Sequence, residues 1–167
     1  CFGLSRDKWD EFWGICRLFL RCSTGEGVRS GPGDDCAVLN PAVDEELLMT
    51  TDTLVEGVHF PAESDPEKLA YRSCATALSD IAAMGGHARW ASLALTMPNF
   101  EEQWLACFVR GFRRALAIDE TSLIGGDLTR GPLAMTWHIT GTVSKGAAIL
   151  RSGAQLHDDI YVTGSLG

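Results

Sequence analysis

Residues Gly31-Pro32-Gly33-Asp34-Asp35-Cys36-Ala37-Val38 read GPGDDCAV and place two adjacent carboxylates between a glycine-rich turn and an apolar run. Glycine, proline and aspartate are turn residues for steric and hydrogen-bonding reasons, so a solvated turn explains the stretch without further chemistry. The chain also carries a formal net charge of -8. Adjacent like charges repel unless water, a cation or backbone N–H groups hold them. The stretch alone leaves both a turn and a cation site open.

The composition is that of one soluble globular domain. The 167 residues are 46% hydrophobic and 22% charged, which is enough for one core. No apolar run approaches the roughly 20 residues of a membrane span, and arginines interrupt the run at 15–22, so it is not a secretory signal either. The acidic balance argues against nucleic acid, which usually binds a basic face. We expect a cytoplasmic protein with no membrane or nucleic-acid partner.

The cysteines favour free thiols over disulfides. Their spacing is wide and irregular, no CxxC pair is present, and we expect those at 36, 74 and 107 to lie in apolar, core-like surroundings. A zinc site is therefore not favoured. The six are Cys1, Cys16, Cys22, Cys36, Cys74 and Cys107.

Helix and strand patterns intermingle along the chain, which predicts an α/β or α+β domain. The helix that begins near Ser64 or Asp65 has a capping residue, Pro66 in its first turn and many small side chains, so we expect it to be buried. A flexible loop is expected at 23–27. Helices are predicted at 6–22, 64–84 and 101–117, and strands at 36–39, 46–55, 90–97, 122–124, 133–143 and 160–164.

Aspartates recur at the ends of these elements. Asp52 ends a strand, Asp127 follows a double glycine, and Asp80 lies in a helix between residues expected to be buried. A buried helical carboxylate is costly unless it is paired or binds a metal. The alternatives are an exposed or arginine-paired Asp80 and a turn at Asp52. Several carboxylates with nearby hydroxyls are oxygen ligands of the kind that Mg²⁺ prefers.

Magnesium would let an acidic protein bind an anionic nucleotide. Gly33 and Gly126 would allow the backbone to approach a phosphate, and Arg130 and Arg151 follow turns from which they could contact one. Neither GxxxxGK[ST] nor GxGxxG is present, so a P-loop or Rossmann site is not supported. The histidines at 87, 138 and 157 are interpreted as structural or exposed.

Five motifs, taken in order, resemble the thiamine-monophosphate kinase family. GDD and GGD also occur in the wider superfamily of aminoimidazole ribonucleotide synthetase and selenophosphate synthetase, whereas the longer strings favour the thiamine-phosphate branch. The motifs are GPGDDCAVL (31–39), TTDTLVEGVHF (50–60), LSDIAAMGG (78–86), LIGGDLTRGP (123–132) and RSGAQLHDDIYVTGSLG (151–167).

The resemblance implies an aminoimidazole ribonucleotide synthetase-like N-terminal domain, with a mixed four-stranded sheet, helices packed on one face, and sheet pairing across a dimer barrel. It implies a homodimeric transferase of thiamine diphosphate biosynthesis, in which ATP phosphorylates thiamine phosphate with several Mg²⁺ ions. Because the attacking phosphate oxygen would already be ionised, no general base is nominated. By the same resemblance, the metal-binding positions are Asp35, Thr50, Thr51, Asp52, Asp80 and Asp127, the ATP-binding positions are Gly126, Asp127 and Arg151, and His59 contacts thiamine phosphate. Asp34 could then support its neighbouring ligand.

The family resemblance divides the chain into an N-terminal helix and loop at 1–30 and a Mg-ATP-binding domain at 31–167. Family members continue into a second α/β domain, which this sequence lacks, so we expect the chain alone to be a weak kinase. Two alternatives stay open. One is another ATP-using enzyme of the superfamily, and the other is a non-catalytic nucleotide-binding or dimerisation module.

Overall fold

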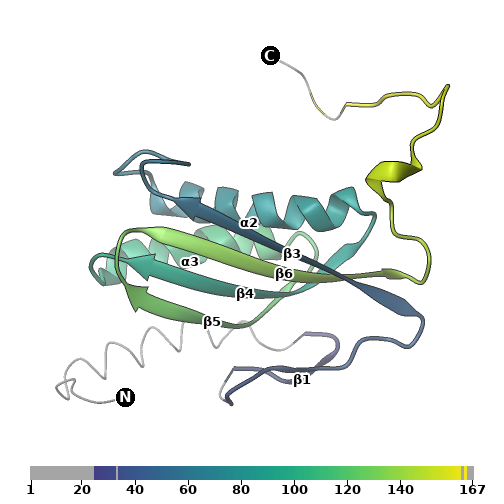
Figure 1. Cartoon of the computed structure of the whole chain (residues 1–167). Coiled ribbons are helices and arrows are strands. Elements are labelled where there is room, and N and C mark those ends of the chain that lie inside the picture. Colours follow the sequence, from purple (N-terminus) through teal and green to yellow (C-terminus); the bar gives the residue numbers. More distant parts are fainter. Residues whose placement is uncertain (1–24, 33, 163, 165–167) are drawn as a thin grey trace.

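The computed structural model describes residues 25–32, 34–162 and 164, and the helix predicted at 6–22 lies outside them. Its centre is a mixed four-stranded sheet with strand order β3-β6-β4-β5. Two helices, α2 and α3, cover one face of this sheet, and Figure 1 views the molecule from the other, open face. The predicted architecture of a mixed sheet with helices on one face is confirmed.

The sheet is antiparallel except at one edge. β3 pairs with β6 and β6 with β4 in antiparallel fashion, while β4 and β5 run parallel because α3 connects them. A separate hairpin of β1 and β2 precedes the sheet. The elements are β1 (Val28–Ser30), β2 (Val38–Leu39), β3 (Glu45–Val55), α2 (Pro66–Ala83), β4 (His87–Met97), α3 (Glu102–Leu116), β5 (Ser122–Arg130), β6 (Ala134–Ser144) and the 3-10 turn η1 (Arg151–Gly153).

Helix α2 begins as its sequence predicts, because Asp65 Oδ1 accepts a hydrogen bond from the Lys68 amide at 2.9 Å. Only one face of the helix is buried. Leu78 and Ile81 lie in the core, but Asp80, Ala82 and Ala83 are exposed. The expectation that small side chains bury this helix was therefore wrong for its outer face, and Asp80 follows the alternative of an exposed helical carboxylate.

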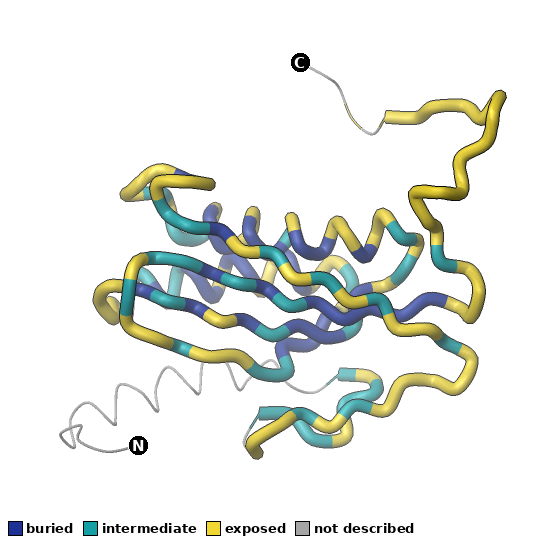
Figure 2. The backbone as a smooth tube through the Cα atoms, viewed as in Figure 1, coloured by how far each residue is buried: buried dark blue, intermediate teal, exposed yellow. Residues whose placement is uncertain are grey.

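The core lies between the helices and the sheet. In β6, polar and apolar residues alternate, so that Trp137 and Ile139 point towards the helices while His138 points to the open face. Trp137 packs edge-on against Phe112 with ring centroids 5.6 Å apart, and its Nε1–H donates to the buried Ser73 hydroxyl at 3.0 Å. Figure 2 shows the same alternation of burial along the strands.

Several boundaries differ from the prediction. β5 extends from Ser122 to Arg130, so the Gly-Gly-Asp motif lies within a strand and not after one. No strand is present at 160–162, where the chain is exposed, and Cys36 is exposed instead of core-like. The cysteines in the described ranges are free thiols, as predicted. None of the helices that the structure describes is long and apolar enough to cross a membrane.

Candidate functional site

The sheet separates the predicted ligands onto two faces. In a strand, neighbouring side chains point to opposite faces, and residues paired across strands share a face. Thr50 pairs with Ile139 and Asp52 with Trp137, and both partners are buried against the helices. Thr50 and Asp52 therefore lie on the helix side of β3, whereas Thr51 lies on the open side.

On the helix side, Thr50 meets a carboxylate from α2. The Thr50 hydroxyl donates to Asp80 Oδ2 at 2.6 Å, which is short for a hydrogen bond and typical of an ionised acceptor. Asp52 lies on the same face two residues further along β3 and is half-buried. Thr50, Asp52 and Asp80 thus form an oxygen-rich group at the free edge of β3.

On the open side, Thr51 and Asp127 have different partners. The Thr51 hydroxyl contacts His138 Nδ1 at 2.8 Å across the β3–β6 pair. Asp127 lies on β5, at the opposite edge of the sheet, where it pairs with Ala94 of β4. Its Oδ2 accepts a hydrogen bond from the Thr129 hydroxyl at 2.6 Å. In a single chain, Asp127 is therefore not brought together with the helix-side group.

The Asp34–Asp35 turn connects β1 to β2. The Asp35 amide donates to Asp34 Oδ1 at 3.1 Å, and both side chains are exposed. This contact is a local turn bond of the kind that aspartates commonly form. The turn is compatible with the simple interpretation of GPGDDCAV, and it leaves the side chain of Asp35 exposed to solvent.

His59 follows the end of β3 and has a defined tautomer when it is neutral. Its Nδ1 accepts a hydrogen bond from the Val55 amide at 3.0 Å. The proton of the neutral ring therefore lies on Nε2, which can donate to an anionic oxygen. The side chain is exposed, so a ligand can reach it.

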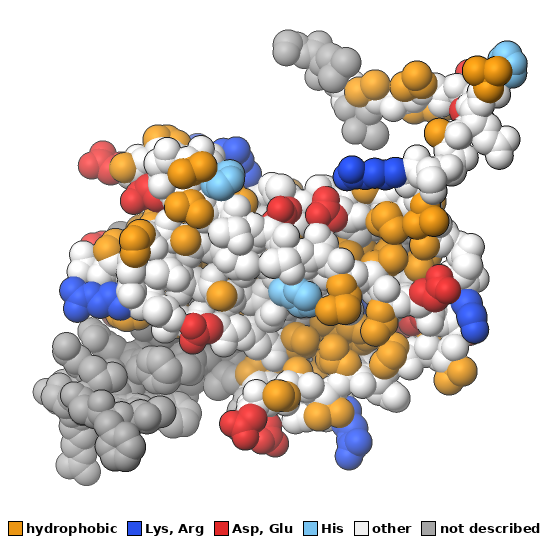
Figure 3. Space-filling view, in the orientation of Figure 1, with side chains coloured by type: hydrophobic (Ala, Val, Ile, Leu, Met, Phe, Trp, Pro, Cys, Tyr) orange, Lys and Arg blue, Asp and Glu red, His pale blue; other side chains and the backbone are white. Residues whose placement is uncertain are grey.

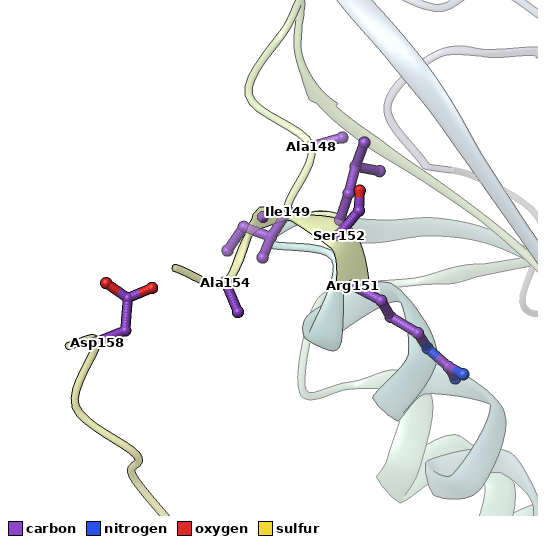
Figure 4. A pocket seen from close by; sticks show the side chains of 8 residues that line it. Ala148, Ile149, Arg151, Ser152, Ala154 and Asp158 are labelled. Carbon is purple, nitrogen blue, oxygen red and sulfur yellow. The ribbon is translucent and has the colours of Figure 1, made fainter. Parts of the chain in front are cut away.

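The remaining two predicted residues lie elsewhere. Gly126 lies in β5, where an added Cβ atom would collide with the backbone oxygen of Leu93. The space beside Gly126 is therefore filled by the backbone of β4. Arg151 lies in η1, in the exposed segment after the sheet. Figure 4 shows a hollow lined by residues 148–154 and Asp158, with the Arg151 side chain directed away from Asp158. Within the described residues, Arg151 forms no ion pair with an aspartate.

The donor types fit magnesium, although no single group is complete. Thr50, Asp52 and Asp80 offer hydroxyl and carboxylate oxygens, the hard ligands that Mg²⁺ takes. Within residues 25–32, 34–162 and 164, no group of three or more histidine, cysteine, aspartate or glutamate side chains is close enough to hold a metal ion. A metal ion bound at this edge would need further ligands from water, substrate phosphates or another part of the protein.

The structure gives specific places to two residues for which the sequence analysis predicted no contact. His138 lies half-buried on the open face, and its alternation with Trp137 and Ile139 was the signal that could have placed it there. Trp90 is buried on β4 and holds the segment before β1, a contact that no local pattern predicts.

Comparison with known proteins places these residues in a family. The model of "AIR synthase related protein, N-terminal domain" matches residues 33–143. The chain is 48% identical over 158 residues to the thiamine-monophosphate kinase of Salmonella typhimurium strain LT2, covering 94% of this chain and 49% of that protein. It thus spans about half the length of this relative.

Two solved structures are similar to the fold. The thiamine-monophosphate kinase of Stenotrophomonas maltophilia K279a matches 87% of this chain and 45% of its own, with TM-score 0.76 and 40% identity. AaThiL in complex with AMPPCP and TMP matches 93% of this chain and 48% of its own, with TM-score 0.64 and 26% identity. With the matched family model, these findings show that the chain belongs to the AIR synthase related proteins, as their N-terminal domain.

Proposed function

We propose that this chain is the Mg-ATP-binding, N-terminal part of a thiamine-monophosphate kinase, which transfers the γ-phosphoryl group of ATP to thiamine phosphate and yields thiamine diphosphate. The observation that carries the proposal is the 48% identity to a thiamine-monophosphate kinase over 94% of the chain. A related structure that binds AMPPCP and TMP supports the same pair of substrates. The oxygen-rich group at Thr50, Asp52 and Asp80 is compatible with this chemistry.

Phosphoryl transfer mainly needs positioning and neutralisation of charge. In this proposal, Asp52, Asp80 and Thr50 would hold Mg²⁺ at the edge of β3, and Asp35 would add an oxygen. Thr51, whose hydroxyl lies on the open face, would serve another of the several Mg²⁺ ions. When bound, the metal would supply charge neutralisation on the phosphates. The attacking phosphate oxygen of thiamine phosphate is already ionised, so no general base is required from the protein.

The remaining roles follow the predicted positions. His59, with its Nε2–H directed by the bond at Nδ1, donates to the phosphate of thiamine phosphate. Gly126, Asp127 and Arg151 contact the nucleotide. Residues 31–167 form the nucleotide-binding unit, and 1–30 form an N-terminal extension.

We further propose that two copies of the chain pair through the edge strands of their sheets and so form a barrel. β3 and β5 are the two edges of the sheet, three strand spacings or about 14 Å apart. Asp52 and Asp127 lie on these opposite edges, so pairing of β3 with β5 of a second copy would bring the two edges side by side, with Asp52 on the helix side and Asp127 on the open side of the joined sheet. The apolar side chains of Leu47 and Met49 are 49% and 64% exposed on the open face and support such pairing. Figure 3 shows hydrophobic side chains gathered over this region of β3 and β6.

Light scattering on a sizing column tests the pairing. Met49→Glu places a charge on the open face, and Val43→Glu places one at a position that is 101% exposed outside the sheet. We expect the wild type and Val43→Glu to be dimeric and Met49→Glu to be monomeric. A monomeric wild type contradicts the barrel.

Calorimetry tests the function. We expect ATP to bind with Mg²⁺ and not with a chelator, and thiamine phosphate to bind as well. His59→Ala should weaken thiamine phosphate and leave ATP binding unchanged, while His157→Ala in the exposed segment serves as the matched control. ATP binding without thiamine phosphate binding favours the non-catalytic module or another enzyme of the superfamily. A chain that binds neither ligand contradicts the proposal for these residues.

A further inference from the structure

The β1–β2 hairpin is attached to the sheet through a short segment before it, residues 25–27, which we call the strap. Among the described elements, β1 and β2 pack mainly against each other. The strap crosses the start of β4 and β5 on the open face, where the hairpin lies below the sheet in Figure 1. Its sequence is Gly-Glu-Gly, which was predicted to be a flexible loop.

Two contacts join Glu26 to β4. The Nε1–H of Trp90 donates to the Glu26 carbonyl oxygen at 3.1 Å, and the Trp90 side chain is only 2% exposed. The Arg89 guanidinium donates to Glu26 Oε2 at 3.1 Å and lies 4.0 Å from Glu45 on β3. Because the Glu26 side chain is 84% exposed, the ion pair contributes less than the indole hydrogen bond.

The shape of β4 makes this double contact possible. The pairing of β4 with β6 shifts register between Ala88 and Trp90, which leaves Arg89 as an extra residue. Such a bulge redirects side chains at the end of a ladder. Arg89 and Trp90 are consecutive and would point to opposite faces of a regular strand, yet here both reach Glu26.

The glycines of the strap allow its backbone to lie directly on these side chains. A Cβ at Gly25 would collide with the Ser122 hydroxyl, and one at Gly27 would lie 2.7 Å from the Trp90 ring. Gly27 also has φ +74°, a conformation that favours glycine. Both ends of the hairpin meet here, because Gly27 precedes β1 and its carbonyl accepts from the Asn40 amide, just after β2, at 2.8 Å.

We propose that the strap and its two partners on β4, Trp90 and Arg89, position the Asp34–Asp35 turn relative to the sheet, so that Trp90 and Arg89 are positioning residues for the metal–nucleotide site. The proposal rests on the proposed function, because the turn matters only if Asp35 serves that site. The geometry follows from the hydrogen bonds that converge on residues 26 and 27. Movement of the strap would carry both ends of the hairpin, and with them the turn at its tip.

The test compares two glycines with the same backbone conformation. Gly27→Ala adds both a strained φ and the collision with Trp90, whereas Gly146→Ala, at φ +76° with nothing within 4 Å, adds the strain alone. Trp90→Phe removes the N–H donor and keeps a ring, which provides a second test if Gly27→Ala fails to fold. Hydrogen exchange of residues 28–40 is measured without metal, and Mg-dependent ATP affinity is measured by calorimetry.

We expect exchange over 28–40 to rise by about fivefold or more in Gly27→Ala and Trp90→Phe, as loss of one ordinary hydrogen bond gives. ATP affinity should fall in the same two variants, while exchange in β3 and β6 stays unchanged. Gly146→Ala should change neither readout. Faster exchange with unchanged ATP affinity would contradict the positioning role of Trp90 and Arg89. Unchanged exchange would show that the strap does not hold the hairpin in place. If the wild type binds no ATP, the proposed function fails, and the exchange rates alone decide whether the strap holds the turn.

Discussion

Replacing Asp80 by asparagine tests whether this residue is a metal ligand or an ordinary surface carboxylate. The substitution removes the charge but keeps an oxygen that can accept from the Thr50 hydroxyl, now 2.6 Å from Asp80 Oδ2. We therefore expect the free energy of unfolding to change by less than about 0.5 kcal/mol, as at other exposed positions. Any large effect on ligand binding then reflects the lost charge and not lost structure.

The expected loss of affinity follows from Coulomb's law. Asp80 is exposed, so the dielectric constant of water applies. Two unit charges 4 Å apart then interact by about 1 kcal/mol, so a divalent ion and one carboxylate gain about 2 kcal/mol, or thirtyfold in affinity, and direct ligation at shorter distance gives more. Mg-dependent ATP binding by calorimetry should weaken in Asp80→Asn by at least this factor.

The control is Asp44→Asn, which removes the same charge at an exposed position just before β3. It should leave ATP affinity within about twofold of the wild type, because salt screens the effect of a surface charge that does not contact the ligand. Equal affinity in Asp80→Asn and the wild type would refute the reasoning and return Asp80 to an ordinary helical carboxylate. Equal losses in both variants would show that net charge and not a ligand is responsible.

Three further predictions concern the framework of the site. Burial raises the pKa of the Cys74 thiol from 9.0 to about 12, so the unfolded chain loses this proton first as the pH rises. The free energy of unfolding should therefore fall above pH 9 by up to about 1.4 kcal/mol per pH unit, and urea titrations at pH 8.5 and 10.5 should show a smaller fall in Cys74→Ala. Ser73→Ala leaves the buried Trp137 indole N–H without its acceptor and should cost about 1–3 kcal/mol in urea denaturation, but much less when Trp137→Phe is also present. Gly126→Ala drives a methyl group into the β4 backbone and should lower the melting temperature by several degrees, whereas Gly125→Ala, with nothing within 4 Å of its Cβ, should be tolerated.

The elements of the sheet were predictable because each carries its own periodic signal. Residues 46–55 and 133–143 alternate in polarity or are rich in β-branched side chains, and the structure has strands at Glu45–Val55 and Ala134–Ser144. The cap at Asp65 fixed the start of α2 in the same local way. These signals depend on neighbours within a few residues, so one sequence suffices to interpret them.

The spatial grouping of the aspartates was not predictable in that way. The motifs indicate that Asp52, Asp80 and Asp127 can bind a metal ion, but they do not show on which side of the sheet each aspartate lies. That face depends on strand register and on the bulge where β5 pairs with β4 between Ala91 and Ser92. The strap contact of Trp90 with Glu26 is similarly invisible in the sequence, because it joins residues 64 positions apart.

The two candidate ligands Asp80 and Asp127 share the same local arrangement. Asp80 and Asp127 each accept a hydrogen bond from a threonine hydroxyl at 2.6 Å, from Thr50 and Thr129. A hydroxyl donor stabilises a carboxylate and restricts its rotamers without adding a competing positive charge. An arginine at the same place would repel an incoming Mg²⁺, whereas a threonine oxygen can itself become a ligand. The pairing of threonines with aspartates is therefore compatible with the proposed divalent-ion site.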